Sequence, residues 1–377
     1  MFSAPKALIS FKTSTKGDHI MGEKILMKGN EVIAEAALRA GCRYYFGYPI
    51  TPQTEVAHYF AKKMPQYGGA FIQAESEIAA MNMVYGAASA GARSMTSSSS
   101  PGISLKQEAI SYAACAELPA VVVNIVRAGP GLGGILAAQG DYFQATKGGG
   151  HGDYRMVVLA PSSVQELYEL TVEAFNIADK YRTLCMIMGD GMLGQMMEGV
   201  EFRDSEEICQ SDKDWAATGT GMKREHNTIT SIYIDPEVLE NHNLKLQAKY
   251  RKITENETRV ETYNCDGADI IVTAYGTVAR IIKNVIKTAA KEGIKIGLIR
   301  PITLWPFPAA AFEKYAEVPK AFLSVELSAG QMVEDVRLAV NGKRPVYFHG
   351  RMGGMIPTQN EILDKIKEIL NNVGAER

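Results

Sequence analysis

Three side chains in this sequence follow strand-like segments and have the chemistry to contact a ligand: Thr51, Glu77 and Arg127. A hydroxyl group donates and accepts hydrogen bonds, a desolvated carboxylate pairs with a ligand, and a guanidinium grips a carboxylate or phosphate at two points. In an open α/β sheet, ligands bind outside the carboxyl ends of the strands. Each of the three is therefore a candidate site residue.

Thr51 lies between two prolines, Pro49 and Pro52, after an aromatic run that begins at Tyr44. Prolines at this spacing stop a strand abruptly, so we expect Thr51 to project from the strand's end. Many such loops carry a proline only to end the strand, and this pattern by itself fits that structural role as well.

Glu75 and Glu77 join a short strand to a helix rich in Ala, Met and Gly. Carboxylates are common in a first helical turn because the helix dipole and the free N–H groups favour them, and either glutamate fits that role. The residues from Ile78 to Val84 are apolar on nearly every side, which predicts a helix that is buried all round. A carboxylate at its head is then expected to be desolvated and paired with a ligand.

Arg127 directly follows the apolar segment Val121–Val126 and precedes the glycine-rich run Gly129–Gly134. A structural salt bridge and an anion contact are equally good interpretations of an arginine in this position. The glycine run resembles a phosphate cradle, but it does not follow the first strand of a dinucleotide-binding unit. We therefore interpret it as a flexible lid.

The elements that must position these side chains alternate between strand and helix. The segment Val121–Val126 has the β-branched, nearly continuous apolar character of a central parallel strand. This alternation predicts an α/β fold with a doubly wound parallel sheet. The expected strands of the first unit are Tyr44–Tyr48, Ala70–Ala74, Arg93–Thr96, Pro119–Val126, Met156–Ala160 and Thr183–Met188.

Changes in pattern divide the chain into four segments. Residues 1–21 mix Lys, Ser and Thr ahead of a second plausible start at Met21, and we treat them as a tail that a tag or an upstream start would explain. Residues 22–198 form the first α/β domain. From 199 to 267 polar residues dominate and hydrophobic periodicity is poor, which predicts a linker or an extended arm. Alternation resumes over 268–377, the second and smaller α/β domain.

Composition narrows the class of protein. With 40 basic and 42 acidic residues in 377, the net charge of -2 gives no reason to expect nucleic acid or an anionic membrane as a partner. The most apolar stretch, Ala109–Val126, is interrupted by Glu117 and Pro119 and is too short to span a bilayer. The 5 cysteines contain no Cys-x-x-Cys pair, which argues against a metal cluster held by this chain alone and suits a reducing, cytoplasmic compartment.

Several motifs occur together in an order that resembles one enzyme family. They are Tyr48-Pro49-Ile50-Thr51-Pro52, Glu75-Ser76-Glu77, the serine run from Thr96 to Gly102, Arg127, Asp190-Gly-Met-Leu-Gly-Gln-Met-Met and the proline-rich run from Arg300 to Pro308. Over about residues 22–367 they resemble the alpha subunit of split-chain 2-oxoacid:ferredoxin oxidoreductases. In that family a pyrimidine-binding domain for thiamine diphosphate precedes a transketolase C-terminal-like domain. The 2-oxoisovalerate (branched-chain) members are most similar, and the 2-oxoglutarate type is second.

The resemblance implies roles for the candidate residues. Glu77 matches the glutamate that hydrogen-bonds the aminopyrimidine ring of thiamine diphosphate, with Glu75 as the alternative if the motif is shifted. A carboxylate there shares a proton with a ring nitrogen and so activates the cofactor. Thr51 and Arg127 match residues around the carboxylate and the reacting carbonyl of the 2-oxoacid.

The resemblance also implies what this chain lacks. Pro49 and Ile50 would lie at the cofactor together with Thr51. The family's Mg²⁺–diphosphate motif, Gly-Asp-Gly followed by a spaced asparagine, is missing. Asp190 has the first part, but the next asparagine is Asn227, so we assign Asp190 to a strand-end turn and no metal to this chain. Mg²⁺ and the diphosphate half would lie on a beta subunit, and iron–sulfur clusters on beta and ferredoxin-like subunits.

The expected activity is oxidative decarboxylation of a 2-oxoacid with coenzyme A as co-substrate and ferredoxin as electron acceptor, in a complex with beta, gamma and ferredoxin-like subunits. A 2-oxoglutarate-specific member and a non-catalytic assembly or regulatory subunit are the alternatives. A self-contained transketolase-like enzyme is disfavoured because the diphosphate-binding half is missing. Two other features carry no assignment: His151 fits a solvated loop, and the methionines at 192, 196 and 197 fit adaptable packing or a subunit contact.

Overall fold

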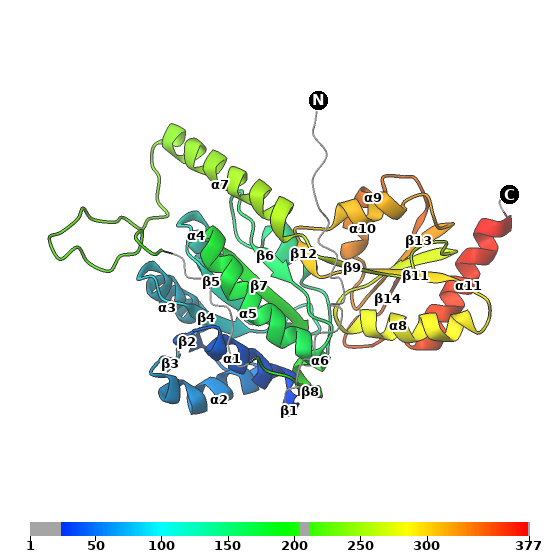
Figure 1. The fold of residues 1–377 in the computed structure, drawn as a ribbon, viewed down its shortest axis with the longest axis horizontal. Coiled ribbons are helices and arrows are strands. Elements are labelled where there is room, and N and C mark those ends of the chain that lie inside the picture. The colour runs from blue at the N-terminus through cyan, green and yellow to red at the C-terminus, as the bar shows by residue number, and fades with distance from the viewer. Residues whose placement is uncertain (1–23, 204–211, 376–377) are drawn as a thin grey trace.

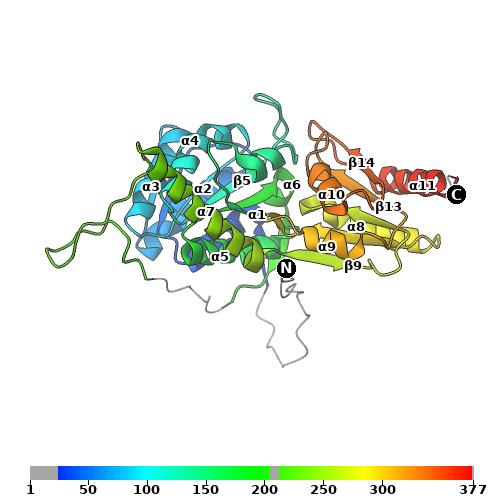
Figure 2. The same cartoon turned by 90° about the horizontal axis from the view of Figure 1, so that it is seen from above.

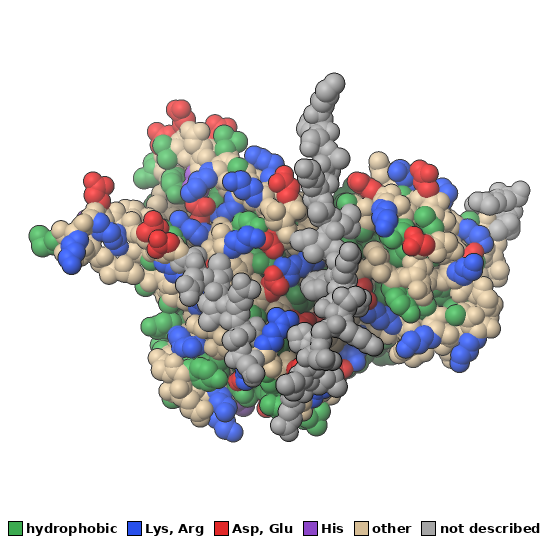
Figure 3. Space-filling view, viewed as in Figure 1, with side chains coloured by type: hydrophobic (Ala, Val, Ile, Leu, Met, Phe, Trp, Pro, Cys, Tyr) green, Lys and Arg blue, Asp and Glu red, His purple; other side chains and the backbone are tan. Residues whose placement is uncertain are grey.

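The computed structural model describes residues 24–203 and 212–375, so the expected tail at residues 1–21 lies outside the described residues. Two α/β units lie side by side, and a long helix crosses the first of them (Figures 1 and 2). Basic and acidic side chains are interspersed over the face seen in Figure 3. In the described ranges, no helix combines the length and the apolar character needed to cross a membrane.

The first sheet contains strands that are all parallel except the last in sequence. They are β2 (Tyr44–Gly47), β3 (Ala70–Gln73), β4 (Ser94–Ser98), β5 (Ala120–Val126), β6 (Val157–Leu159), β7 (Leu184–Asp190) and β12 (Thr303–Trp305). Their order in the sheet is β12-β6-β7-β5-β4-β2-β3, and β12 runs antiparallel to β6. The predicted parallel sheet is confirmed.

Helices cover both faces of this sheet. On one face, α1 (Gly29–Arg39), α2 (Thr54–Lys63) and α5 (Val164–Tyr181) share a hydrophobic core. On the other face, α3 (Glu77–Ser89) and α4 (Pro101–Cys115) pack over a second core. The central strand β5 is buried along its whole length because successive side chains enter the two cores in turn.

The second unit has its own sheet and helices. Its strands are β9 (Val260–Tyr263), β10 (Ile270–Thr273), β11 (Ile296–Pro301), β13 (Ala321–Glu326) and β14 (Val346–Gly350), in the order β14-β13-β10-β11-β9 with β9 antiparallel. Its helices are α8 (Gly276–Ala290), α9 (Ala309–Tyr315), α10 (Met332–Val340) and α11 (Gln359–Ala375). Helices α8 and α11 share one core, and α9 and α10 pack on the opposite face.

The polar segment between the units contains more regular structure than its pattern indicated. It includes the end of β8 (Met197–Val200), which pairs with β1 (Ile25–Lys28), the long helix α7 (Pro236–Glu257) and strand β9 of the second sheet, and the short helix α6 (Gly191–Gln195) precedes it. Helix α7 buries only Leu246, Tyr250, Ile253 and Glu257, a stripe of one side chain per turn. So narrow a stripe gives a weak hydrophobic period, which is why the helix was not predicted. The loop before α7 extends away from the body (Figures 1 and 2).

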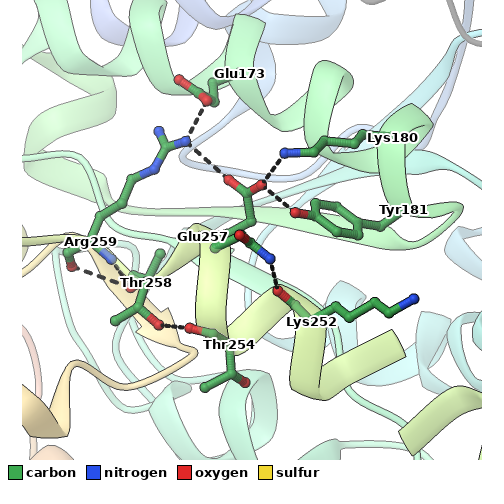
Figure 4. Close-up of polar contacts among 10 residues, drawn as sticks. Glu173, Lys180, Tyr181, Lys252, Thr254, Glu257, Thr258 and Arg259 are labelled. Atoms are coloured by element: carbon green, nitrogen blue, oxygen red, sulfur yellow. Dashed lines mark hydrogen bonds and ion pairs between the residues drawn. The ribbon is translucent and has the colours of Figure 1, made fainter. Parts of the chain in front are cut away.

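A dense polar network ties the end of α7 to the first unit (Figure 4). The buried carboxylate of Glu257 accepts hydrogen bonds from Lys180 Nζ at 2.8 Å and from Tyr181 Oη at 2.7 Å, both at the end of α5. Arg259 Nη2 contacts the same carboxylate at 3.3 Å and also pairs with Glu173. Because every charge in this network is compensated, it fastens the arm where it enters the second unit.

Candidate active site at the strand ends

The three candidate side chains follow neighbouring strands of the first sheet. Thr51 follows β2, Glu77 follows β3 and Arg127 follows β5. In the sheet, β2 and β3 are neighbours, and β4 lies between β2 and β5. Parallel strands end at the same edge of a sheet, so all three residues lie along one edge. The serine run begins within β4, at Ser97 and Ser98, and continues to Ser100 before α4.

Arg127 joins two loops at this edge. It is 7% exposed, and its Nη1 donates to the main-chain oxygen of Thr51 at 2.9 Å while its Nη2 donates to the main-chain oxygen of Leu132 at 2.9 Å. Its Nε is buried without a hydrogen-bond partner, and no carboxylate in residues 24–203 or 212–375 forms an ion pair with it. The structural salt bridge considered for this arginine is therefore absent from the described part of the chain.

Residues Pro49 and Ile50 lie in the turn that leads from β2 to α2. Ile50 O accepts hydrogen bonds from Gln53 N at 3.2 Å and Thr54 Oγ1 at 3.3 Å. The Thr51 side chain is exposed beyond this turn, as its position between prolines predicted. This turn holds the Thr51 carbonyl where Arg127 contacts it.

Glu77 is buried at the head of α3, whereas Glu75 is exposed. Ser76 caps the helix, since its Oγ accepts from Ala79 N at 3.2 Å. The Glu77 carboxylate accepts no hydrogen bond from the residues that the structure describes, although Glu77 is only 6% exposed. It lies against Gly102, where an added Cβ would come within 2.6 Å of Glu77 Oε1. The glycine after the serine run therefore makes room for the carboxylate.

The rest of α3 is not buried all round, so that prediction was wrong. Ala80, Met81 and Val84 enter the core, but Ile78 is 48% exposed and Asn82 faces solvent. The apolar residues on the outer side of α3 are thus not needed for the packing of this chain. An exposed apolar surface of this kind is typical of a protein–protein contact.

Sequence reasoning did not identify the residues that hold the serine run. Ser100 stands before α4, but its Oγ contacts Arg127 N at 3.0 Å instead of capping the helix. Ser100 N donates to Asn124 Oδ1 at 3.1 Å, and Asn124 Nδ2 donates to Asp141 Oδ2 at 2.8 Å. Burial raises the pKa of Asp141. The polar Asn124 within an otherwise apolar strand was the signal available in the sequence.

Several buried polar atoms at this edge have no partner among the described residues. They are Gln53 Nε2, Ser98 Oγ, Ser99 Oγ and Arg127 Nε. A buried polar group without a hydrogen bond is costly, and such groups are rare in folded proteins. Their concentration along the ends of β2, β4 and β5 therefore points to a polar ligand that would satisfy them.

Asp190 ends β7 opposite Val126, and His151 lies in the loop before β6; neither belongs to this group of unpartnered atoms. Asp190 caps α6 through Oδ1, which accepts from Met192 N and Leu193 N at 3.0 Å, and its Oδ2 accepts from Thr277 N at 3.3 Å. Burial raises its pKa. Asp190 is thus the strand-end residue predicted, and it also fastens the second unit to the first. His151 is exposed in its glycine-rich loop.

A pocket of about 670 Å³ opens beside Thr51, between the two units. Its walls come from the turn after β2, the loop after β5, α6 and the loop after β14. Most of the lining is apolar; the residues are Thr51, Pro52, Ile135, Leu136, Ala137, Gly191, Met192, Gln195, Met196, Gly354 and Ile356. Met192 and Met196, for which packing was one interpretation, thus line this pocket.

Comparison with known families identifies the family of this chain. Residues 35–262 match the model described as pyruvate flavodoxin/ferredoxin oxidoreductase, thiamine diphosphate-binding, and residues 268–362 match core domain II of pyruvate:ferredoxin oxidoreductase. The chain belongs to this oxidoreductase family. The resemblance inferred from the motifs is thereby confirmed, and the family's thiamine diphosphate-binding domain contains the whole strand-end site.

Individual members of the family are similar over nearly the full chain. The ketoisovalerate oxidoreductase subunit VorB of Methanothermobacter thermautotrophicus is 51% identical over 91% of this chain and 97% of its own length. The 2-oxoglutarate synthase subunit KorA of Archaeoglobus fulgidus is 38% identical over 83% of this chain and 91% of its own. Both relatives are subunits, so this chain is a subunit of a multi-subunit oxidoreductase.

Two solved structures share the fold. The 2-oxoglutarate:ferredoxin oxidoreductase of Magnetococcus marinus, solved with 2-oxoglutarate, coenzyme A and succinyl-CoA bound, aligns with a TM-score of 0.84 and 28% identity, covering 93% of this chain and 66% of that chain. A split-gene transketolase aligns with a TM-score of 0.55 at 13% identity, which shows the fold alone. The predicted transketolase-like architecture is therefore confirmed.

Proposed function

We propose that this chain is the alpha subunit of an oxidoreductase that converts a branched-chain 2-oxoacid, coenzyme A and oxidised ferredoxin into acyl-CoA, CO₂ and reduced ferredoxin. In this reaction the bond to the carboxylate breaks, the acyl carbon bonds to the coenzyme A sulfur, and the thiol proton is released. The electron pair left behind passes to ferredoxin one electron at a time. The observation that carries the proposal is the buried Glu77 carboxylate without a protein donor at the edge of a thiamine diphosphate-binding domain.

The residues at the strand ends fit the aminopyrimidine ring of thiamine diphosphate. Glu77 supplies an acceptor for a ring N–H, and Ser98, Ser99 and Gln53 supply buried polar atoms that have no other partner. Pro49 and Ile50 would border the ring beside Thr51. When bound, the cofactor supplies the carbanion chemistry and the electron sink of the reaction. The chain's own contribution is to hold the ring and to keep the shared proton at Glu77.

Arg127 and Thr51 are proposed to bind the 2-oxoacid. A guanidinium is always charged and presents several donors, which suits a substrate carboxylate. The contact from Arg127 to the Thr51 main chain fixes both residues relative to each other. Arg127 would then bring a permanent positive charge to the substrate, with its unpartnered Nε as an available donor.

The apolar pocket beside Thr51 is proposed to hold the substrate's side chain. Ile135, Leu136, Met192 and Ile356 give it a lining that suits a branched aliphatic group better than a second carboxylate. The relatives named ketoisovalerate oxidoreductase subunits, at 51% and 50% identity, favour the same substrate class over the 2-oxoglutarate type at 36% to 38%.

A beta subunit is proposed to cover the strand-end site. The elements that carry the site, α3, α4 and the loop after β5, expose apolar side chains, namely Ile78, Leu105 and Leu132. A patch of this kind marks a protein interface. The beta subunit would bring Mg²⁺ and the diphosphate-binding half, and beta and ferredoxin-like subunits would carry the iron–sulfur clusters, with a gamma subunit completing the complex. We place the complex in the cytoplasm, where free cysteines such as Cys42 and Cys185 stay reduced.

The test of the proposed reaction is Glu77→Gln in the chain co-expressed with its partner subunits. Glutamine has the same shape but no carboxylate to hold the shared proton, so coenzyme A-dependent reduction of viologen should fall by at least ~100-fold while the complex still assembles. Glu75→Gln is the matched control, because that exposed glutamate lies two residues away, and it should keep wild-type rates. Wild-type rates from Glu77→Gln would favour a non-catalytic assembly subunit instead.

The substrate class is tested by placing a charge in the pocket. Leu136→Arg should lower the ratio of kcat/KM for 2-oxoisovalerate to that for 2-oxoglutarate by at least ~10-fold, because an arginine fills apolar space and attracts the second carboxylate. Leu338→Arg, on the exposed face of α10, is the control and should leave the ratio unchanged. A wild-type enzyme that prefers 2-oxoglutarate would contradict the assignment.

A further inference from the structure

Three polar side chains, Asn30, Glu55 and Gln195, form a cluster beside the main-chain oxygen of Pro52. Asn30 Nδ2 donates to Pro52 O at 2.7 Å, and Gln195 Nε2 donates to the same oxygen at 3.1 Å. Both amides also donate to the carboxylate of Glu55, from Asn30 at 2.8 Å and from Gln195 at 2.9 Å. The three side chains come from α1, α2 and α6, so the cluster joins three helices to the turn after β2.

The Glu55 carboxylate decides which way the two amides face. Burial alone would raise the pKa of Glu55, but hydrogen bonds from Gln195, Asn30 and Lys28 outweigh burial and hold the pKa below its usual value. The carboxylate is therefore ionised at neutral pH and can only accept hydrogen bonds. An amide must then turn its NH₂ group, and not its oxygen, toward Glu55 and Pro52 O. Lys28 Nζ donates to Gln195 Oε1 at 3.4 Å, which fits the same orientation.

The orientation of Asn30 depends on these two acceptors alone. Asn30 is fully buried, and its Oδ1 has no hydrogen-bond partner in residues 24–203 or 212–375. Gly194 leaves room for this oxygen, since an added Cβ there would come within 2.6 Å of Asn30 Oδ1. If residue 55 lost its charge and offered a donor, Asn30 could turn its oxygen toward that donor and withdraw its NH₂ group from Pro52 O.

The cluster and Arg127 fix the same short piece of main chain. Arg127 Nη1 donates to Thr51 O at 2.9 Å, and the cluster holds the next carbonyl, that of Pro52. The carbonyl of Ile50 is held separately, by hydrogen bonds within the turn itself. Thr51, Pro52 and Gln195 all line the apolar pocket. The cluster therefore sets the position of one wall of that pocket.

We propose that Glu55 is a positioning residue for the 2-oxoacid: its carboxylate orients the Asn30 and Gln195 amides so that both donate to Pro52 O, which holds Thr51 where it contacts the substrate. This inference rests on the proposed function. Reacting groups must be held within a narrow range of positions, so a small displacement of Thr51 lowers the rate. Because the Ile50 carbonyl is held independently, the part of the turn proposed to border the cofactor stays in place.

The experiment uses Glu55→Gln in the co-expressed complex, because glutamine has the same shape and no charge. The new amide offers one oxygen and one NH₂ group in place of two acceptors, so one of the neighbouring amides loses its acceptor. We expect kcat/KM for 2-oxoisovalerate to fall by at least ~10-fold. Calorimetric titration should give an unchanged affinity for thiamine diphosphate.

A second variant removes a donor instead of the acceptor. Gln195 is exposed at the end of α6, so Gln195→Met is expected to fold, and methionine suits the apolar lining of the pocket. Because Asn30 still donates to Pro52 O, kcat/KM should fall by about 3-fold to 10-fold, the value of one hydrogen bond. The affinity for thiamine diphosphate should again be unchanged.

Glu35→Gln is the matched control. Glu35 also joins α1 to α2, since it accepts hydrogen bonds from Arg39 Nε at 2.7 Å and from Tyr59 Oη at 2.9 Å, but it does not line the pocket. This variant should lower the unfolding temperature and keep the wild-type kcat/KM. It separates a loss of contact between the two helices from a displacement of the turn.

A double-mutant cycle tests whether Glu55 acts through Thr51. Thr51→Val removes the hydroxyl group and keeps the shape of the side chain. If Glu55 positions Thr51, Glu55→Gln should lower kcat/KM by less than ~3-fold further when it is introduced into Thr51→Val, because the two residues serve the same contact. A general loss of structure would instead multiply the two effects.

Each outcome decides between the interpretations. Wild-type kcat/KM in both Glu55→Gln and Gln195→Met would overturn the role of Glu55, and so would effects that multiply fully with that of Thr51→Val. An equal loss in Glu35→Gln would reduce the cluster to a contact between helices. If Thr51→Val or Glu77→Gln keeps full activity, the proposed function fails. If both lose activity while Glu55→Gln keeps it, only the inference on Glu55 fails.

Discussion

Two buried arginines at strand ends, Arg127 and Arg300, lie in opposite electrostatic surroundings. Arg300 in β11 is 2% exposed, and its guanidinium contacts the Glu166 carboxylate at 2.7 and 2.9 Å and the Glu261 carboxylate at 2.6 Å. Arg127 contacts only main-chain oxygens and keeps an unpartnered Nε. Burial is the same, but only Arg300 has its charge compensated within the described residues.

The same contrast separates two buried glutamates. Glu257 is enclosed by Lys180, Tyr181 and Arg259 (Figure 4), whereas the carboxylate of Glu77 accepts no hydrogen bond from the described chain. In the network around Glu257 every polar group already has a partner, so a ligand would gain no hydrogen bond there and the network is structural. Unsatisfied buried groups gain hydrogen bonds when a ligand arrives, and we propose the cofactor site on that basis. The difference between these two regions is the strongest local argument for where the cofactor binds.

The largest effect is expected at the saturated region. Arg300→Met should lower the free energy of unfolding by about 3–5 kcal/mol, because it leaves the Glu166 and Glu261 carboxylates partly buried without their partner. Chemical denaturation of the purified chain measures this. The folded fraction should still bind thiamine diphosphate in the complex. If Arg300→Met is as stable as the wild type but no longer binds thiamine diphosphate, the structural role assigned to Arg300 is wrong.

Arg127→Met should give the opposite result. We expect kcat/KM for the 2-oxoacid to fall by about 10²–10³-fold, equivalent to about 3–4 kcal/mol of transition-state binding, as for loss of one preorganised donor. The free energy of unfolding should change by less than about 1.5 kcal/mol, because only hydrogen bonds to main-chain oxygens are lost. Steady-state kinetics with both Arg127→Met and Arg127→Lys measures the effect. Full activity in Arg127→Met would remove Arg127 from the site.

Lys106 in α4 is fully buried, and its ammonium donates to Thr96 Oγ1 at 3.0 Å and to the main-chain oxygen of Glu77 at 3.3 Å. This buried charge predicts a pH-dependent stability. Its pKa is about 8 in the folded chain and near 10.5 in the unfolded chain, so between these values the unfolded state binds more protons and stability rises with pH. The wild type should therefore gain about 2 kcal/mol relative to Lys106→Met between pH 8 and pH 9.5. Denaturant unfolding of both proteins at each pH measures the difference. A difference that stays constant with pH would mean that Lys106 is not a desolvated charge.

The smallest effect is expected for an unsatisfied hydroxyl at the strand ends. Ser98→Ala should leave the unfolding free energy within about 0.5 kcal/mol, because Ser98 Oγ has no partner in the described chain to lose. It should weaken thiamine diphosphate binding by about 0.5–1.5 kcal/mol, the net value of one hydrogen bond. Calorimetric titration of the complex measures the affinity. Unchanged affinity together with unchanged stability would mean that Ser98 does not contact the cofactor.

The sequence was informative where local rules decide the structure. The β-branched run that became β5 and the proline-bounded turn at Thr51 predicted the sheet and the edge where the candidate residues lie, because strand character and proline geometry are local properties. The clustering of Thr51, Glu77 and Arg127 along one edge followed from the parallel topology.

Other features depended on partners distant in the chain, and no local pattern revealed them. Strand β12 leaves the second unit to pair with β6, and the carboxylate of Asp141 reaches Asn124. The burial of Lys106 was not predicted because a single lysine in a helical segment is typical of a surface residue, and only its neighbours in space show otherwise. The burial predicted for α3 was wrong because apolar residues alone do not tell a core face from a face left exposed on one subunit.

The most direct test of the central claim is the number of protons taken up when thiamine diphosphate binds to the complex. If the Glu77 carboxylate receives the ring N–H, wild type and Glu75→Gln should take up about one proton near neutral pH, because ring and carboxylate then share a proton drawn from solvent. Glu77→Gln should bind with an uptake close to zero. Equal uptake by wild type and Glu77→Gln would contradict the assignment of the buried glutamate as the cofactor's partner.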